Sequence, residues 1–194
     1  MIRKTLFSIT GIAMLFACSE PSEHPGFEMT ESGLYYKIDG SGDESARSVA
    51  LDDVVTLKMS YTTDNDSVLF DSDKQGQDVI IKIGPPAYKG GFMEGMTMMK
   101  EGDSASFITS ADSFFTKVAN TTLPPGIASG SKLTFNVEVL KVQSEEEFIG
   151  AREAAQAEQM AVENESILAF VERMGITEEP KESGLYFIET QPGS

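Results

Sequence analysis

Apolar and polar residues alternate along several short stretches of this chain. The stretches cover residues 34–38, 55–61, 79–83, 104–109 and 133–139, and glycine or aspartate residues separate them. Because successive side chains of a β-strand point to opposite faces of the sheet, each stretch has one apolar face and one polar face. Strands of this kind bury one face and leave the other in water. The pattern therefore predicts one antiparallel sheet of about five strands with a single apolar core.

One short helix is predicted to cover the apolar face of this sheet. Phe92, Met96 and Met99 have helical spacing, and glycines stand on both sides of them, at residues 90–91 and 102. The predicted fold class is α+β, a curved antiparallel sheet wrapped around a short helix, within residues 32–143. A domain of this length can bury a core of its own.

The first residues have the composition of a secretory leader. Arg3 and Lys4 precede an uncharged apolar stretch at residues 9–16, which is shorter than the roughly 20 apolar residues that a membrane span needs. Residues 15–18, Leu-Phe-Ala-Cys, resemble the bacterial lipobox, in which the cysteine is acylated and becomes the mature N-terminus. We therefore predict a lipoprotein signal peptide at residues 1–17 and lipidation of Cys18. The alternative is an ordinary signal-peptidase site, or a buried free thiol at Cys18.

This leader predicts where the protein lies. A lipid on Cys18 would attach the chain to the bacterial cell envelope, and we expect it at the outer membrane, facing the periplasm. Residues 18–31 are polar and contain proline, so they are predicted to form a flexible tether between the lipid and the folded domain. The membrane, contacted through the N-terminal lipid, is thus one predicted partner.

The composition excludes several classes of function. The only histidine, His24, lies in the tether, and the only cysteine lies in the leader. Catalytic triads, Cys-His pairs and histidine-based zinc sites need a histidine held in a folded cleft, so we expect no metal and no cofactor. The formal net charge is -16, which argues against a nucleic-acid partner because phosphate contacts need clustered Lys and Arg.

Residues 144–175 are predicted to form a charged, amphipathic helical extension. Ser144 and Glu147 have the spacing of a capping box, and glutamate and alanine are frequent after them. Apolar residues then recur at helical spacing up to Gly175: Ile167, Phe170, Val171 and Met174. The pattern fits one long helix, or two helices with a second cap at residues 164–166. Its apolar stripe is expected to pack on the domain or on a partner.

Residues 176–194 contain an echo of the first predicted strand. Residues 182–187 repeat five of the six residues at positions 31–36, and a Pro-Gly pair follows at residues 192–193. A match of five residues in six could arise by chance. The repeated segment is nevertheless the opening strand of the domain, so we expect this tail to resemble the first strand of a second copy.

Short motifs between residues 32 and 142 resemble the FKBP family in their order and spacing. They are Asp53-Val54-Val55-Thr56-Leu57 to Tyr61, Phe70-Asp71-Ser72, Ile83-Gly84, Gly91-Phe92, Glu94-Gly95, Met99 to Gly102, Leu123-Pro124-Pro125 and Leu133-Thr134-Phe135-Asn136-Val137-Glu138. The resemblance implies a curved antiparallel sheet around a short helix, in agreement with the alternation. It also implies a peptidyl-prolyl cis-trans isomerase that assists protein folding, with proline-containing polypeptides as clients.

The resemblance further implies the site residues. Around the proline ring it places five side chains: Tyr61, Phe70, Val79, Phe92 and Phe135. It places Asp71 at the rim, facing the twisting amide. Tyr88 and Lys89 match the segment whose backbone pairs with the peptide, and Phe115 falls in the loop that closes over it. Each aromatic residue could instead be an ordinary core residue, and Asp71 a turn or cap residue.

Three features depart from the family pattern. Phe92 stands where the family usually has tryptophan, Phe115 stands where a tyrosine hydroxyl usually binds the peptide, and Tyr88-Lys89 replaces two aliphatic residues. These departures predict weak or altered isomerase activity. They leave open a non-catalytic module that binds clients or acts as a chaperone, and a structural lipoprotein that only keeps the fold.

Overall fold

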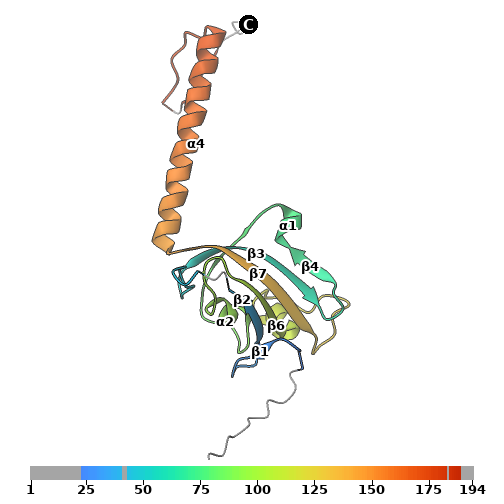
Figure 1. Ribbon diagram of the computed structural model, residues 1–194. Coiled ribbons are helices and arrows are strands. Elements are labelled where there is room, and N and C mark those ends of the chain that lie inside the picture. The colour runs from blue at the N-terminus through green and yellow to red at the C-terminus, as the bar shows by residue number, and fades with distance from the viewer. Residues whose placement is uncertain (1–22, 41–42, 183, 189–194) are drawn as a thin grey trace, which may run out of the picture.

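The structure is a computed structural model, and it describes residues 23–40, 43–182 and 184–188 (Figure 1). The predicted signal peptide and the predicted lipidation site at Cys18 lie outside these residues.

The described residues form one antiparallel sheet of seven strands. The strands are β1 (Glu28–Met29), β2 (Tyr35–Asp39), β3 (Val54–Thr63), β4 (Val68–Asp71), β5 (Val79–Lys82), β6 (Ser104–Ser110) and β7 (Lys132–Gln143). Their spatial order is β1-β2-β6-β7-β3-β4, and β5 also pairs with β3. The predicted α+β fold with an antiparallel sheet is confirmed. The sheet has more strands than predicted because β1 has only two residues and because β4, Val-Leu-Phe-Asp, does not alternate between apolar and polar residues.

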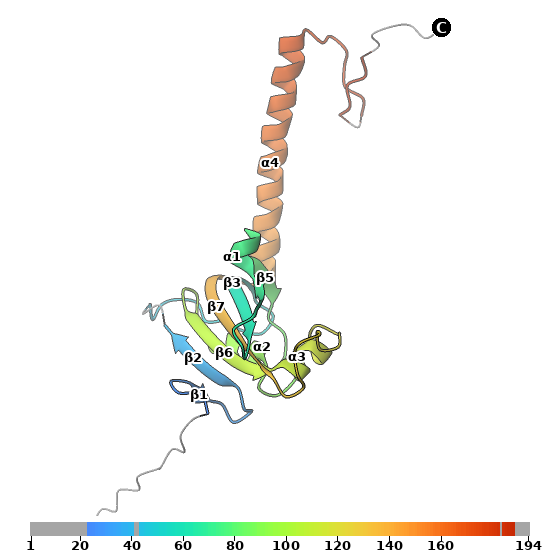
Figure 2. The same ribbon diagram turned by 90° about the vertical axis from the view of Figure 1, so that its right-hand side faces the viewer.

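Three short helices belong to this domain: α1 (Ser72–Gln75), α2 (Phe92–Met96) and α3 (Ala111–Lys117). Helix α2, the predicted covering helix, lies against the sheet (Figure 2), and Met96 and the nearby Met99 are fully buried. The strands contribute the fully buried side chains of Leu57, Phe107, Leu133, Phe135 and Val139, and Leu34, directly before β2, is also fully buried. The core therefore lies between α2 and the apolar face of the sheet.

Helix α4 (Glu145–Met174) is a single helix that projects away from the sheet (Figures 1 and 2). It begins with the capping box seen in the sequence: Ser144 Oγ accepts from the backbone N–H of Glu147, and Glu147 Oε2 accepts from the N–H of Ser144. Gly175 ends the helix in a left-handed conformation, with φ of +67°. No residue of α4 is buried, so its apolar stripe does not pack on the domain.

Two ion pairs join the first turn of α4 to the domain. Arg47 Nη1 lies 2.5 Å from Glu147 Oε2, and its Nη2 lies 2.9 Å from Asp53 Oδ1. Lys82 Nζ lies 2.7 Å from Glu145 Oε2. All of these side chains except Asp53 are substantially exposed, so water and salt weaken the attraction.

In the described part of the chain, no helix combines the length and the apolar composition that a membrane-spanning segment needs.

Candidate active site

The structure brings four of the predicted aromatic side chains together. Tyr61 on β3 is paired in register with Phe70 on β4 and with Phe135 on β7. Residues directly opposite each other in antiparallel strands point to the same face of the sheet, so these rings form a row. The Tyr61 ring centroid lies 5.6 Å from that of Phe70 and 4.9 Å from that of Phe135. Phe92, from α2, completes the cluster at 5.1 Å from Phe135.

A fifth ring, Phe114, belongs to this aromatic cluster although no motif in the sequence pointed to it. It lies on α3, and its centroid is 5.4 Å from that of Tyr61 and 5.1 Å from that of Phe135. The side chain is half-buried and packs against the core. Phe114 therefore extends the aromatic cluster from the sheet to α3.

Phe115, the neighbour that was predicted, lies elsewhere. The segment expected as a loop begins with helix α3, whose cap is Ser110. Ala111 and Phe115, four residues apart on this helix, are both buried in the core. Consecutive residues of a helix point about 100° apart, so Phe114 contacts Tyr61 and Phe135 while Phe115 is buried more deeply.

A small hollow lies beside the cluster. It is lined by Pro86, Ala87, Tyr88, Gly91, Phe92, Met93, Phe114 and Val118. Because Phe114 lines this hollow and also packs on Tyr61 and Phe135, the position of its ring affects the size of the hollow.

Tyr88 is held by a hydrogen-bonded chain. Its hydroxyl lies 2.9 Å from Thr109 Oγ1, which itself donates to the backbone oxygen of Gly90 at 2.7 Å. Because the Thr109 proton goes to Gly90, the Tyr88 hydroxyl is the donor in the first bond. Burial raises the pKa of Tyr88. The hydrogen bonds of Tyr88 and Gly90 to Thr109 therefore hold the 88–90 segment against β6. Lys89, between them, is exposed.

Tyr61 and Val79 occupy half-buried positions on the sheet. Burial raises the pKa of Tyr61, so its hydroxyl stays protonated at neutral pH. A protonated hydroxyl at the edge of an apolar cluster can donate a hydrogen bond to a peptide carbonyl. Val79 on β5 lies opposite Leu57 of β3 and packs against the core.

Asp71 lies on the other face of the sheet. It is paired in register with Ser60, the neighbour of Tyr61, so its side chain and the rings leave the sheet in opposite directions. The carboxylate caps α1, accepting from the backbone N–H of Asp73 and Lys74, and it pairs with the Lys74 ammonium at 3.1 Å. The contact with Lys74 lowers the pKa of Asp71. Its action on a twisting amide remains a prediction.

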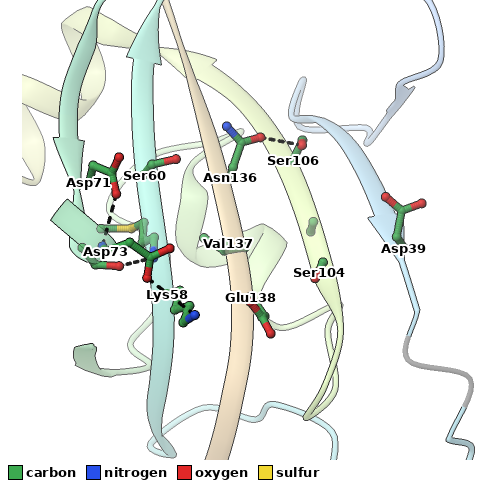
Figure 3. A pocket seen from close by; sticks show the side chains of 13 residues that line it. Asp39, Lys58, Ser60, Asp71, Asp73, Ser104, Ser106, Asn136, Val137 and Glu138 are labelled. Carbon is green, nitrogen blue, oxygen red and sulfur yellow. Dashed lines mark hydrogen bonds and ion pairs between the residues drawn. The ribbon is translucent and has the colours of Figure 1, made fainter. Parts of the chain in front are cut away.

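A polar groove of about 390 Å³ runs along this outer face (Figure 3). Its lining includes Lys58, Ser60, Asp71, Asp73, Ser106, Asn136 and Glu138. Lys58 pairs with Asp73 at 3.6 Å, and Ser106 donates to the side-chain oxygen of Asn136 at 2.7 Å. The groove and the aromatic cluster are thus separate features on opposite faces of one sheet.

Comparison with known proteins identifies the domain. Residues 45–140 match the family described as FKBP-type peptidyl-prolyl cis-trans isomerase. A search of curated proteins found no match. Among solved structures, FkpA from Escherichia coli aligns with a TM-score of 0.51 and 21% identity over 63% of this chain and 54% of that one. The peptidyl-prolyl cis-trans isomerase of Pseudomonas syringae pv. tomato aligns with a TM-score of 0.50 and 14% identity over 63% of this chain and 84% of that one.

The two structural similarities bear on the fold alone, because both identities are low. The alignment spans about half the length of FkpA. The family match covers β3 to β7, the strands that carry the aromatic row, together with α2 and α3. Residues 45–140 of this chain therefore form a domain of the FKBP-type peptidyl-prolyl cis-trans isomerase family.

Proposed function

We propose that the domain catalyses cis-trans isomerisation of the bond that precedes proline in polypeptide clients. The observation that carries this proposal is the aromatic row of Tyr61, Phe70 and Phe135, closed by Phe92 from α2. These rings come from four different elements, and their neighbouring centroids lie between 4.9 and 5.6 Å apart. The family match supports the type of reaction, and the aromatic row offers an apolar surface on which that reaction can occur.

The reaction needs no nucleophile. Amide resonance keeps the X-Pro bond planar behind a barrier of about 20 kcal/mol. The twisted transition state has lost that resonance and part of its carbonyl polarity, so an apolar surface favours it over the well-hydrated planar amide. Each increment of about 1.4 kcal/mol in this preference raises the rate tenfold. Burial raises the pKa of the Tyr61 hydroxyl, so it is protonated at neutral pH and can donate a hydrogen bond to the peptide.

We further propose that the protein works at the cell envelope, where it assists the folding of envelope proteins. The support is the lipobox-like sequence that ends at Cys18 and the polar tether that follows it. Labelling with a radioactive fatty acid tests this part. Label should enter the wild-type protein, and Cys18→Ser should abolish both the label and the association with membranes. Equal labelling of both proteins would contradict the proposal.

A second candidate function is a non-catalytic module that holds clients. The position of Phe114 favours it, because this ring fills the space next to Tyr61 and Phe135 that a proline would enter. Phe92 in place of tryptophan also offers the proline less area for stacking. In this case the same apolar cluster would bind unfolded segments without accelerating isomerisation.

An isomerisation assay on a proline-containing peptide separates the two candidates. The full chain should accelerate isomerisation. Phe70→Ala should lower kcat/KM at least tenfold because it removes one of the three rings of the aromatic row. Phe170→Ala, which removes an exposed ring on α4, is the matched control and should leave kcat/KM unchanged. If the wild-type chain shows no rate above that of the free peptide, yet suppresses aggregation of an unfolded client, the module is the correct function.

A further inference from the structure

The tail and the segment that opens the domain adopt the same turn. Before β2, the N–H of Thr30 donates to the backbone oxygen of Leu34 at 2.9 Å, and the N–H of Gly33 donates to that of Thr30 at 3.0 Å. In the tail, the same two bonds recur at 3.0 and 2.7 Å, between Lys181 and Leu185 and between Gly184 and Lys181. The repeat in sequence is therefore also a repeat in backbone conformation.

A glycine makes this turn possible in both places. Gly33 has φ of +90° and Gly184 has φ of +80°. Residues with a side chain rarely adopt this left-handed region, so the shared glycine is required by the conformation. Five identical residues together with two matching hydrogen bonds and a matching φ are difficult to ascribe to chance.

In the first copy, this turn fastens a strand to the domain. Leu34 is fully buried in the core, and the residues after it form β2, which pairs with β6 from Tyr35 opposite Ile108 onward. Ser32 Oγ donates to the Glu94 carboxylate of α2, at 2.5 Å from one oxygen and 2.6 Å from the other. The turn thus places one leucine in the core and starts one strand at the edge of β6.

The tail presents the same apolar residues with no sheet beside them. Leu185, which corresponds to Leu34, is 61% exposed, and Phe187, which corresponds to Tyr36, is 63% exposed. No strand is assigned to residues 176–182 or 184–188. The turn is already formed, so less conformational entropy would be lost when the segment docks.

The domain of the same chain is not a suitable acceptor. Its β2 position is filled, and α4 separates the tail from the sheet. A 30-residue helix spans about 45 Å at 1.5 Å per residue, and Figures 1 and 2 show it pointing away from the strands. The complementary surface is therefore the β6 edge of another sheet of this kind whose own β2 position is open.

We propose that residues 181–188 are a β2-type strand that docks at the β6 edge of a second FKBP-type sheet whose own β2 position is open, with Leu185 in the place of Leu34. Helix α4 then acts as a spacer between two such sheets. Three positions differ between the copies. Lys181 replaces Thr30 and lacks the hydroxyl that accepts from the Leu34 N–H at 3.2 Å, whereas the other two differences agree with this role. Lys37 is exposed, so Ile188 can replace it, and Phe187 keeps the ring of Tyr36 while losing only the hydroxyl that bonds Glu28.

The first test is made in the full chain. The triple variant T30K/Y36F/K37I converts residues 30–37 into the sequence of residues 181–188. If the tail is a competent β2 strand, Tm should fall by less than about 5 °C, a range that corresponds to a small change in stability. Leu34→Ser, the control, should lower Tm by more. A triple variant as unstable as Leu34→Ser would overturn the proposal.

The second test measures docking itself. Leu34→Ala weakens β2 in the full chain, whose domain then stands in for the second sheet. A synthetic peptide of residues 178–189 should raise its Tm in a concentration-dependent way, because a ligand of the folded state stabilises it. The same peptide with Leu185→Ser should not. No rise with the natural peptide, or an equal rise with both peptides, would overturn the proposal. Should Leu34→Ala not fold, Leu34→Val gives the same comparison.

Discussion

Gly95 allows α2 to lie directly on the sheet. A Cβ atom at this position would clash with the Phe107 ring, which is fully buried and has no space to move. In an exposed helix, Gly→Ala stabilises by about 1 kcal/mol because glycine loses more backbone entropy on folding. Here we expect the opposite sign: Gly95→Ala should lower the free energy of unfolding by about 1–3 kcal/mol through overpacking.

Gly150 provides the matched control for Gly95. It lies within α4, and a Cβ atom there would meet nothing within 4 Å. Gly150→Ala should therefore leave the domain's denaturation midpoint unchanged and raise the helix content, as measured by circular dichroism. Chemical denaturation of both variants checks the prediction, which fails if Gly95→Ala is as stable as the wild type.

Phe114 and Phe115 should respond differently to removal of the ring. Under the proposed function, Phe114→Ala enlarges the small hollow beside Phe92 and should raise kcat/KM several-fold in the peptide assay. Phe115 is 7% exposed in the core, so Phe115→Ala should cost about 3–5 kcal/mol of stability without any gain in rate. A fall in kcat/KM for Phe114→Ala would show that this ring holds the peptide instead of excluding it.

At the scale of the elements, alternation predicted the strands that have one wet and one buried face. Strands β3 and β7 are long enough to show it, so Tyr61 and Phe135 could be assigned to the same face from the amino-acid sequence alone. Alternation does not reveal how a helix is rotated about its axis. The roles of Phe114 and Phe115 depend on the rotation of α3 and were therefore not separated by the sequence.

The place of Asp71 was hidden for a related reason. Its position after Phe70 suggested a residue at the rim, but pairing with Ser60 turns its side chain to the outer face. Phe70 and Asp71 are consecutive residues of β4, so their side chains point to opposite faces of the sheet. This could not be seen from the sequence because no strand was predicted at residues 68–71.

The first turn of α4 should loosen in acid. The bond from the Ser144 N–H, followed by the contact with Arg47, lowers the pKa of Glu147 from 4.5 to about 2. Because the folded-state pKa is the lower one, this stabilisation is complete above pH 4.5 and is lost as the pH falls through about 2. Amide NMR signals of residues 144–147 should therefore titrate near pH 2.

Glu147→Gln is the control for this titration. Glutamine can still accept from the Ser144 N–H, as in other capping boxes, but it has no charge to lose. The amide signals of residues 144–147 should therefore show no titration near pH 2 in this variant. A midpoint close to 4.5 in the wild type would contradict the assigned contacts.

At the scale of the whole molecule, α4 and the domain are structurally almost independent. No side chain of α4 is buried, and its links to the domain are ion pairs at its first turn. Exposed ion pairs contribute roughly 0–1 kcal/mol each. A chain that ends at residue 144 should therefore keep its Tm within a few degrees of the full chain, as measured by near-ultraviolet circular dichroism.

The same independence leaves apolar side chains on α4 without cover. Met160, Val162, Leu168 and Met174 are each at least 60% exposed. Helices in proteins gain most of their stability from packing, so a helix as exposed as α4 should fray more readily than the domain unfolds. Amide hydrogen exchange should show protection that falls from the capped first turn of α4 toward its middle, while β3 and β7 exchange only with global unfolding. Protection of residues 160–174 equal to that of β7 would mean that another surface covers the helix in solution.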